Sequence, residues 1–162
     1  MTMPRRMIAV TALVIGVAAG WIFVLPARPA AQPIAFSHAH HQALSCAGCH
    51  RGVEIAARAT LPGPGVCTKC HATPPRGLDP TEWHAFESGV ARWTRVTHVP
   101  DHVMFSHRRH VSLAKLDCQS CHADIGRRTQ PPGRTPIRLD MATCRACHSR
   151  ERASEDCAAC HR

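Results

Sequence analysis

All ten cysteines of the 162-residue chain fall in one repeated pattern, Cys-x-x-Cys-His. The pattern occurs five times, and we number the copies along the chain as attachment sites. They are Cys46, Cys49 and His50 (site 1); Cys67, Cys70 and His71 (site 2); Cys118, Cys121 and His122 (site 3); Cys144, Cys147 and His148 (site 4); and Cys157, Cys160 and His161 (site 5). Two thiols three positions apart can add to the two vinyl groups of one haem, and the next histidine then reaches the iron as its proximal ligand. The sequence therefore predicts five covalently bound haem c groups.

Three other uses of cysteine fit the pattern less well. A disulfide framework does not explain a histidine after every second cysteine. Structural zinc sites commonly pair one Cys-x-x-Cys with another, and five is an odd number of half-sites. A thioredoxin-like motif would occur once, near a β-α-β pattern, and none is visible. Haem attachment accounts for all ten thiols and all five adjacent histidines.

The rest of the composition is poor in material for a conventional core. The chain has no tyrosine, four phenylalanines and three tryptophans, together with 13 prolines and 10 glycines. Small domains of this kind usually recruit disulfides or metals for stability. We expect a mostly irregular fold, with short α-helices wrapped around five haems and little or no β-structure.

The formal net charge of +9 suggests nucleic acid as a partner only if the haems are ignored. Five haems would bring about ten negative propionate groups, which offset that charge. The many arginines then suit propionates better than a phosphate backbone. We therefore expect no nucleic-acid partner.

Eight histidines lie outside the attachment sites: His38, His40, His41, His84, His98, His102, His107 and His110. Four of them fall in a repeat, Phe-Ser-His-x-x-His, at residues 36–41 and 105–110, which we call the first and second histidine repeats. The serine suits the start of a helical turn. Histidines three apart then project from neighbouring positions on that turn, so one turn can bind two different irons. A haem with both axial positions filled transfers electrons, whereas one with an open position can transform a substrate.

The N-terminus predicts export. Arg5 and Arg6 precede an uncharged stretch, Met7–Leu25, which as a helix would be about 28 Å long, enough to cross a bilayer core. The apolar regions of signal peptides are usually shorter. We expect an uncleaved N-terminal transmembrane helix, with a cleaved signal peptide as the alternative. Either segment would place the rest of the chain on the periplasmic side of a bacterial cytoplasmic membrane, where c-type haems are attached.

A histidine repeat followed by Cys-x-x-Cys-His resembles the class III multihaem cytochromes c, which are small haem-packed domains with bis-histidine ligation. In that family the first histidine of the pair binds the haem just downstream, and the second binds another haem of the same module. The resemblance implies that His38 is the distal ligand at site 1 and His41 at site 2. It likewise implies that His107 serves site 3 and His110 serves site 4.

The distal ligand of the fifth haem stays open. Class III members with three haems carry a further histidine just before the middle motif, but here that region reads Leu139–Thr143 and holds no histidine. Met141 is the nearest ligand-competent residue, and methionine ligation typically raises the reduction potential. The alternatives are a histidine upstream (His98, then His102 or His84) and a vacant position.

Three longer segments, 99–111, 141–148 and 156–162, narrow the resemblance to the pentahaem subunit of alternative complex III, a bacterial quinol-oxidising membrane assembly. This resemblance implies a membrane-anchored electron carrier without catalytic residues. It would take electrons from an iron–sulfur or quinol-oxidising subunit and pass them to a periplasmic cytochrome or an oxidase. A free-standing anchored cytochrome that links quinol dehydrogenases to reductases would share every residue. A small haem reductase would need one open iron and is a third hypothesis.

The attachment sites and prolines divide the chain into five predicted parts. These are an anchor at 1–25, a proline-rich tether at 26–34, a two-haem module at 35–72, a connector at 73–103 that holds a possible short helix over Trp83–Trp93, and a three-haem module at 104–162.

Overall fold

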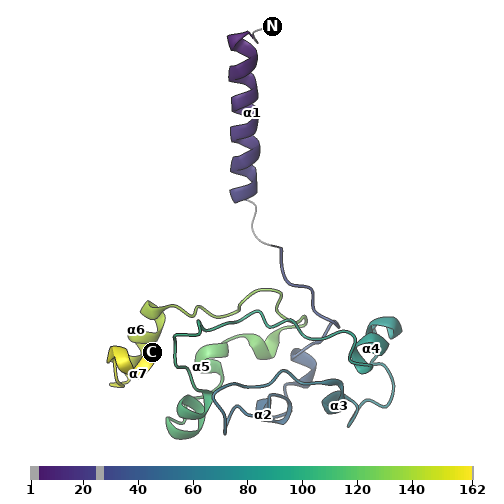
Figure 1. Ribbon diagram of the computed structural model, residues 1–162. Coiled ribbons are helices and arrows are strands. Elements are labelled where there is room, and N and C mark those ends of the chain that lie inside the picture. Colours follow the sequence, from purple (N-terminus) through teal and green to yellow (C-terminus); the bar gives the residue numbers. More distant parts are fainter. Residues whose placement is uncertain (1–3, 25–27, 162) are drawn as a thin grey trace.

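The computed structural model describes residues 4–24 and 28–161, with the backbone alone described for residues 5 and 18–24. Helix α1 (Arg5–Val24) stands apart from the remainder of the chain in Figure 1. We call residues 28–161 the main region. It consists of short helices joined by long irregular segments (Figure 1), as the many prolines and glycines predict.

The helical elements of the main region are mostly one turn long. They are η1 (Ala39–His41), α2 (Cys46–Cys49), α3 (Pro64–Cys67), α4 (Pro80–Glu87), the π-helical turn η2 (Arg108–Leu113), α5 (Gln119–His122), η3 (Ile125–Arg127), α6 (Met141–Arg150) and α7 (Cys157–Cys160). No strand occurs among the described residues, and an isolated antiparallel bridge joins Val103 to His161. The predicted fold class of short helices and irregular chain is confirmed.

The predicted transmembrane helix is not supported. The stretch Met7–Leu25 is helical as far as Val24, while Leu25 lies outside the described residues. Among the residues that the structure describes, no helix combines the length and the apolarity that crossing a bilayer requires.

Helix α4 lies in the segment predicted as a connector, and its ends follow from local chemistry. The Asp79 side chain accepts hydrogen bonds from the backbone N–H groups of Thr81 (2.7 Å) and Glu82 (3.4 Å), and Pro80 occupies the first helical position. Gly89 follows the helix with φ +78°, a conformation that glycine adopts without steric cost. These two ends hold a two-turn helix in place.

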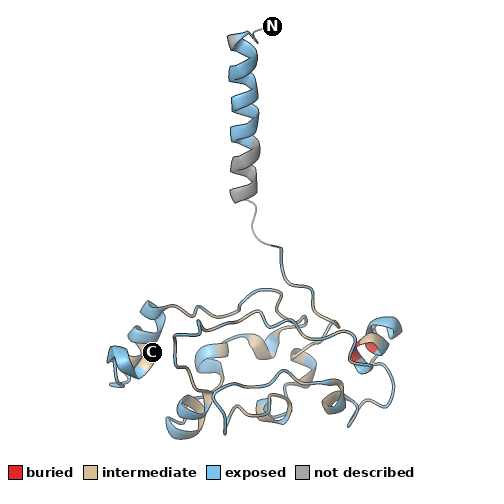
Figure 2. Cartoon of the chain, viewed as in Figure 1, coloured by how far each residue is buried: buried red, intermediate tan, exposed pale blue. Residues whose placement is uncertain are grey.

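The buried hydrophobic side chains of the described residues gather at α4. Phe86 is 2% exposed, Trp83 4% and Ile34 5%, and Figure 2 shows the buried patch on this helix. Phe86 packs edge-on against Trp93 (5.4 Å between ring centroids), which in turn meets Phe36 (6.3 Å). We call Phe36, Trp83, Phe86 and Trp93 the aromatic cluster. It brings the first histidine repeat against the segment that follows α4.

The segment predicted as a tether docks onto two distant parts of the chain. Gln32 donates from its amide nitrogen to the carbonyl oxygens of Thr94 (3.0 Å) and Pro132 (2.9 Å). The Ala30 N–H donates to the Gly133 carbonyl oxygen at 2.7 Å. Residues 30–32 are therefore fixed to the loop before α6 as well as to the segment after α4.

Candidate haem-binding sites

Each attachment site sits on a helical turn. Sites 1 and 5 use the whole of α2 and α7, site 2 begins at the last residue of α3, site 3 overlaps α5, and site 4 lies within α6. Residues three apart on a helix lie on one face, so both thiols of a site point the same way. All ten cysteines are described, and none of them forms a disulfide.

The first histidine repeat forms a tight turn around Phe36. The Phe36 ring stacks on the His41 ring (4.7 Å between centroids, 25° between planes) and meets the His38 ring edge-on (4.8 Å, 89°). Ser37 Oγ accepts a hydrogen bond from the His40 N–H at 3.3 Å, as a capping serine does. The phenylalanine thus fixes two imidazoles in different orientations.

The second histidine repeat has the same geometry. Phe105 stacks on His110 (4.8 Å, 20°) and meets His107 edge-on (4.9 Å, 88°). Ser106 Oγ accepts a hydrogen bond from the Arg109 N–H at 3.4 Å. No role could be assigned to this phenylalanine from the sequence alone. A phenylalanine stands at the same position in both repeats, however, and this recurrence is the sequence signal that it orients both histidines.

Four proximal histidines have a second imidazole opposite them among the described residues. The pairs are His38 with His50 (6.3 Å between ring centroids, 8° between planes), His41 with His71 (6.1 Å, 67°), His110 with His148 (6.1 Å, 38°) and His102 with His161 (5.5 Å, 17°). These contacts involve sites 1, 2, 4 and 5. Each joins a site to a histidine outside the attachment motifs.

The separations suit a metal ion held between two imidazoles. A metal–imidazole bond is about 2 Å long and the ring centre lies further out, so two imidazoles on opposite sides of one ion have centres about 6 Å apart. The pairs at sites 1, 2 and 4 match this value, and the pair at site 5 is slightly closer. The donor set therefore fits haem iron, with the adjacent thiols as its covalent attachment.

The hydrogen bonds of the imidazoles involve Nδ1 and leave Nε2 free to bind a metal ion. Five of these rings place Nδ1 within 2.7–3.1 Å of a backbone carbonyl oxygen: His41 on Ser37, His50 on Thr60, His107 on Ala57, His110 on Ser106 and His148 on Ser154. Since a carbonyl only accepts, Nδ1 carries the proton and Nε2 keeps its lone pair. Histidines that bind metals typically donate their other ring N–H in this way.

Burial also favours the neutral form of three imidazoles. It is the main cause that lowers the pKa values of His38, His107 and His122. Only a neutral imidazole has a lone pair for a metal ion. The Nδ1 atom of His38 is buried and has no hydrogen-bond partner among the described residues.

His107 lies near His122 of site 3. After burial, the charges of His107 and then His50 lower the pKa of His122. His107 is anchored through its ring to the Ala57 carbonyl oxygen, in the loop that follows site 1. Site 3 is therefore close to the second histidine repeat and also to site 1.

The three other candidates for the fifth distal ligand lie at the surface. Met141 begins α6 and is 58% exposed. His84 and His98 are exposed, and His98 uses Nε2 rather than Nδ1 in a 2.7 Å hydrogen bond with the Arg95 carbonyl oxygen. His102 is exposed as well, but its ring stacks on that of His161. The Val103–His161 bridge and a 2.8 Å hydrogen bond from the Met104 N–H to the Cys160 carbonyl oxygen hold this pair together.

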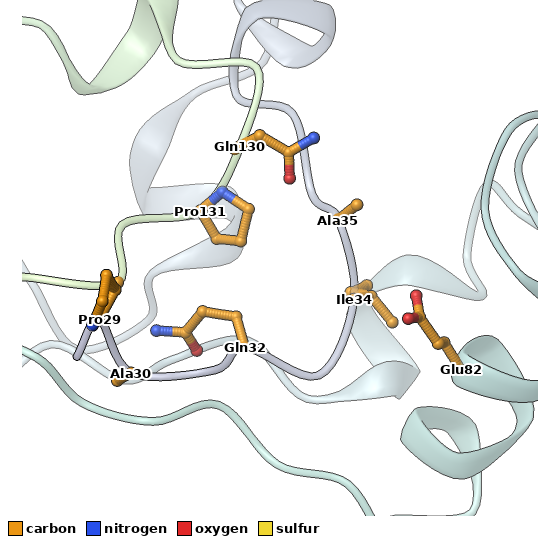
Figure 3. Close-up of a pocket in the computed structure, with 9 residues that line it drawn as sticks. Pro29, Ala30, Gln32, Ile34, Ala35, Glu82, Gln130 and Pro131 are labelled. Atoms are coloured by element: carbon orange, nitrogen blue, oxygen red, sulfur yellow. The ribbon is translucent and has the colours of Figure 1, made fainter.

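A separate cavity of about 320 Å³ lies away from the attachment sites. Figure 3 shows it between residues 29–35, the loop of Gln130 and Pro131, and Glu82 of α4. Its lining holds neither cysteine nor histidine, so it offers no ligand to a haem.

Two family models match adjoining parts of the chain. The Class III cytochrome C family matches residues 24–101, and cytochrome c7 and related cytochrome c matches residues 103–162. Each of these two parts of the chain is thus similar to a family of multihaem cytochromes c. No curated protein matches it. Cytochromes of both families bind covalent c-type haem and carry electrons. The boundary between the matches falls at His102, beside the start of the second histidine repeat.

Proposed function

We propose that this cytochrome carries five haems, each with two histidine ligands, and conducts electrons from haem to haem. The supporting observation is the set of imidazole pairs about 6 Å apart, each with Cys-x-x-Cys beside one member. A vacant axial position, which a haem reductase needs, is not favoured by this arrangement, because a second imidazole faces the attachment-site histidine at sites 1, 2, 4 and 5, and His107 lies near His122 of site 3.

The proposed distal ligands at sites 1 to 4 are those that the family resemblance implied: His38, His41, His107 and His110. At site 5 we propose His102, which ranked behind Met141 and His98 in the sequence analysis. The contact of the His102 and His161 rings supports this choice. His102 and His161 are distant in sequence, so no local spacing rule could favour them.

In this proposal the polypeptide positions ligands and performs no acid–base chemistry. Haem c supplies a reversible one-electron centre when bound. Phe36 and Phe105 hold the distal imidazoles at fixed angles, and backbone carbonyls hold the ring protons on Nδ1. Fixed ligands reduce the rearrangement that accompanies each change of iron charge.

We further propose that the main region works on the periplasmic side of a bacterial cytoplasmic membrane, as a subunit of a quinol-oxidising complex that resembles alternative complex III. Arg5, Arg6 and the uncharged stretch that follows support export. The assignment to such a complex is based only on the resemblance of segments 99–111, 141–148 and 156–162. Its donor would be an iron–sulfur or quinol-oxidising subunit, and its acceptor a periplasmic cytochrome or oxidase. Purification from native membranes tests this, since migration without large partner subunits would instead favour a free-standing carrier.

The haem count and the ligands are tested separately. Intact mass of the mature protein should show five added haems, and it also reveals whether the N-terminal segment is removed. The visible spectrum should be low-spin throughout. His102→Ala should create one high-spin haem, whereas His98→Ala and Met141→Ala, the matched controls, should leave the spectrum unchanged. A high-spin haem in Met141→Ala, with none in His102→Ala, would return the ligand role to Met141.

A further inference from the structure

The order of the attachment sites in space differs from their order in the sequence. The sequence order would place site 2 between sites 1 and 3. Contacts of the described residues instead join site 1 both to site 2 and to site 3. Because electron transfer depends on which haems are neighbours, this difference changes the route through the protein and the identity of its ends.

Sites 1 and 2 are neighbours through the first histidine repeat. His38 faces His50 of site 1, and His41, one turn later, faces His71 of site 2.

The loop after site 1 contacts the second histidine repeat directly. The backbone N–H of His107 donates to the Ala57 carbonyl oxygen at 3.0 Å, and the ring Nδ1 lies 3.1 Å from the same oxygen. The Arg108 N–H donates to the Ala56 carbonyl oxygen at 3.0 Å, and Ser112 Oγ donates to the Glu54 carbonyl oxygen. The distal ligand proposed for site 3 is therefore anchored on the chain that leaves site 1.

The first histidine repeat also contacts the site 3 region. The Ala39 N–H donates to the Arg128 carbonyl oxygen at 3.0 Å, which brings η1 against η3. Sites 1 and 3 therefore meet at two separate places.

The remaining neighbours follow the sequence. The second histidine repeat carries the distal ligands proposed for sites 3 and 4, and the His110 ring faces His148 of site 4. Sites 4 and 5 lie on α6 and α7, which Figure 1 places at the same end of the main region. An Arg145–Glu155 ion pair (3.3 Å) ties the helix of site 4 to the residues just before site 5.

The arrangement of the helices agrees with these contacts. Figure 1 places α3 and α4 at one end of the main region and α6 and α7 at the other, with α2 and α5 between them. Helix α3, which leads into site 2, packs against α4. Site 2 thus lies on the side of site 1 that is away from site 3.

We propose that the five haems form one chain in the spatial order 2–1–3–4–5. The step between the two family-matched halves runs from site 1 to site 3. The ends of the chain, where outside donors and acceptors exchange electrons, are then the haems of site 2 and site 5. This inference rests on the proposed function, because it requires haem at all five sites.

Proton NMR of the fully reduced, diamagnetic holoprotein tests the order without a variant. Each haem is assigned through contacts of its thioether substituents with the β-protons of its own cysteines. Nuclear Overhauser contacts are expected between haems 1 and 3, and none between haems 2 and 3. Contacts between haems 2 and 3, or none between haems 1 and 3, would overturn the order. Fewer than five haems by mass would instead refute the proposed function.

A matched pair of ligand variants provides a second measurement. His107→Met should raise the reduction potential of haem 3, and His41→Met that of haem 2. Coulomb interaction falls with distance, so a change at one haem shifts its neighbours most. In NMR redox titrations, His107→Met should shift the midpoints of haems 1 and 4 more than those of haems 2 and 5. If His107→Met shifts haem 2 more than haem 1, the proposed order is wrong.

Discussion

The two family-matched parts of this cytochrome fix their attachment helices in different ways. In the second part, an aspartate stands at the start of every such helix: Asp117 Oδ1 accepts from the Gln119 N–H (2.7 Å), Asp140 Oδ1 from the Thr143 N–H (2.7 Å) and Asp156 Oδ1 from the Ala158 N–H (3.2 Å). In the first part, α2 begins after Ser45 and α3 after Gly63, and neither residue makes a side-chain capping bond. Carboxylates thus cap the attachment helices of the second part but not those of the first part.

The hydrophobic packing shows the opposite distribution. Ile34, Trp83 and Phe86, the buried hydrophobic residues of the described chain, all belong to the first part. The second part contributes no fully buried hydrophobic residue within 103–161. The comparison shows that two similar histidine repeats are held in different surroundings. Aromatic packing supports the first part, while aspartate side chains cap the attachment helices of the second. The two parts should therefore respond to different perturbations.

The largest effect should come from the aromatic cluster. Phe86→Ala removes a side chain that is 2% exposed, and substitutions of this kind cost about 3–5 kcal/mol of unfolding free energy. Chemical denaturation of the holoprotein should show this loss, with sites 1 and 2 exposed at lower denaturant than sites 3 to 5. Val90→Ala is the control, because Val90 is 83% exposed and should cost little. Equal effects of the two substitutions would contradict the role of the cluster.

Removal of a helix cap should act on the second part alone. Asp140→Ala leaves the Thr143 N–H without its partner at the start of α6, so the amides of this helix should exchange with solvent several-fold faster. Asp140→Asn should restore protection, because asparagine caps helices about equally well. Ser45→Ala, at the start of α2, should change little. Faster exchange in Ser45→Ala, with none in Asp140→Ala, would remove the proposed difference between the parts.

Low pH should also affect the attachment helices of the second part more than those of the first. Hydrogen bonds from the Thr143 backbone and side chain, and then from Arg138, lower the pKa of Asp140 to about 2. A carboxyl with a lowered pKa stabilises the fold above its ordinary pKa near 4 and loses that effect as pH falls through its folded value. Amide protection in α6 should therefore decrease between about pH 4 and pH 2. The helix of site 1 has no such cap and serves as the internal reference; an earlier loss of protection there would contradict this expectation.

A smaller effect should follow Gly133→Ala. A Cβ atom at this position would lie 2.8 Å from Pro29 Cβ and 3.0 Å from the Ala30 carbonyl oxygen. The clash should weaken the 2.7 Å hydrogen bond from the Ala30 N–H to the Gly133 carbonyl oxygen, and it should raise amide exchange at Ala30. Gly126→Ala is the control, because no atom lies within 4 Å of its added Cβ. An unchanged exchange rate at Ala30 would show that residues 29–30 move aside at no cost.

Local geometry was predictable because it depends on residues close together in the chain. A spacing of three puts both thiols of a site on one helical face, and the structure forms a helical turn at each site. The same spacing puts His38 and His41 on one turn beside Phe36. The scarcity of aromatic residues likewise indicated short helices with little hydrophobic core. The predicted membrane-spanning helix was not borne out, because no helix among the described residues is long and apolar enough to cross a membrane.

By itself, then, the sequence determined the five attachment sites, the paired histidines and the kind of cofactor, since each is written in residues fewer than six positions apart. Only the tertiary structure decided which histidine faces His161 and which site lies beside site 3. The His102–His161 and His107–Ala57 contacts join residues about 50 or more positions apart. Such contacts depend on how irregular segments fold back on one another. In those segments hydrophobic periodicity is weak, so the sequence contains no local pattern that fixes their path.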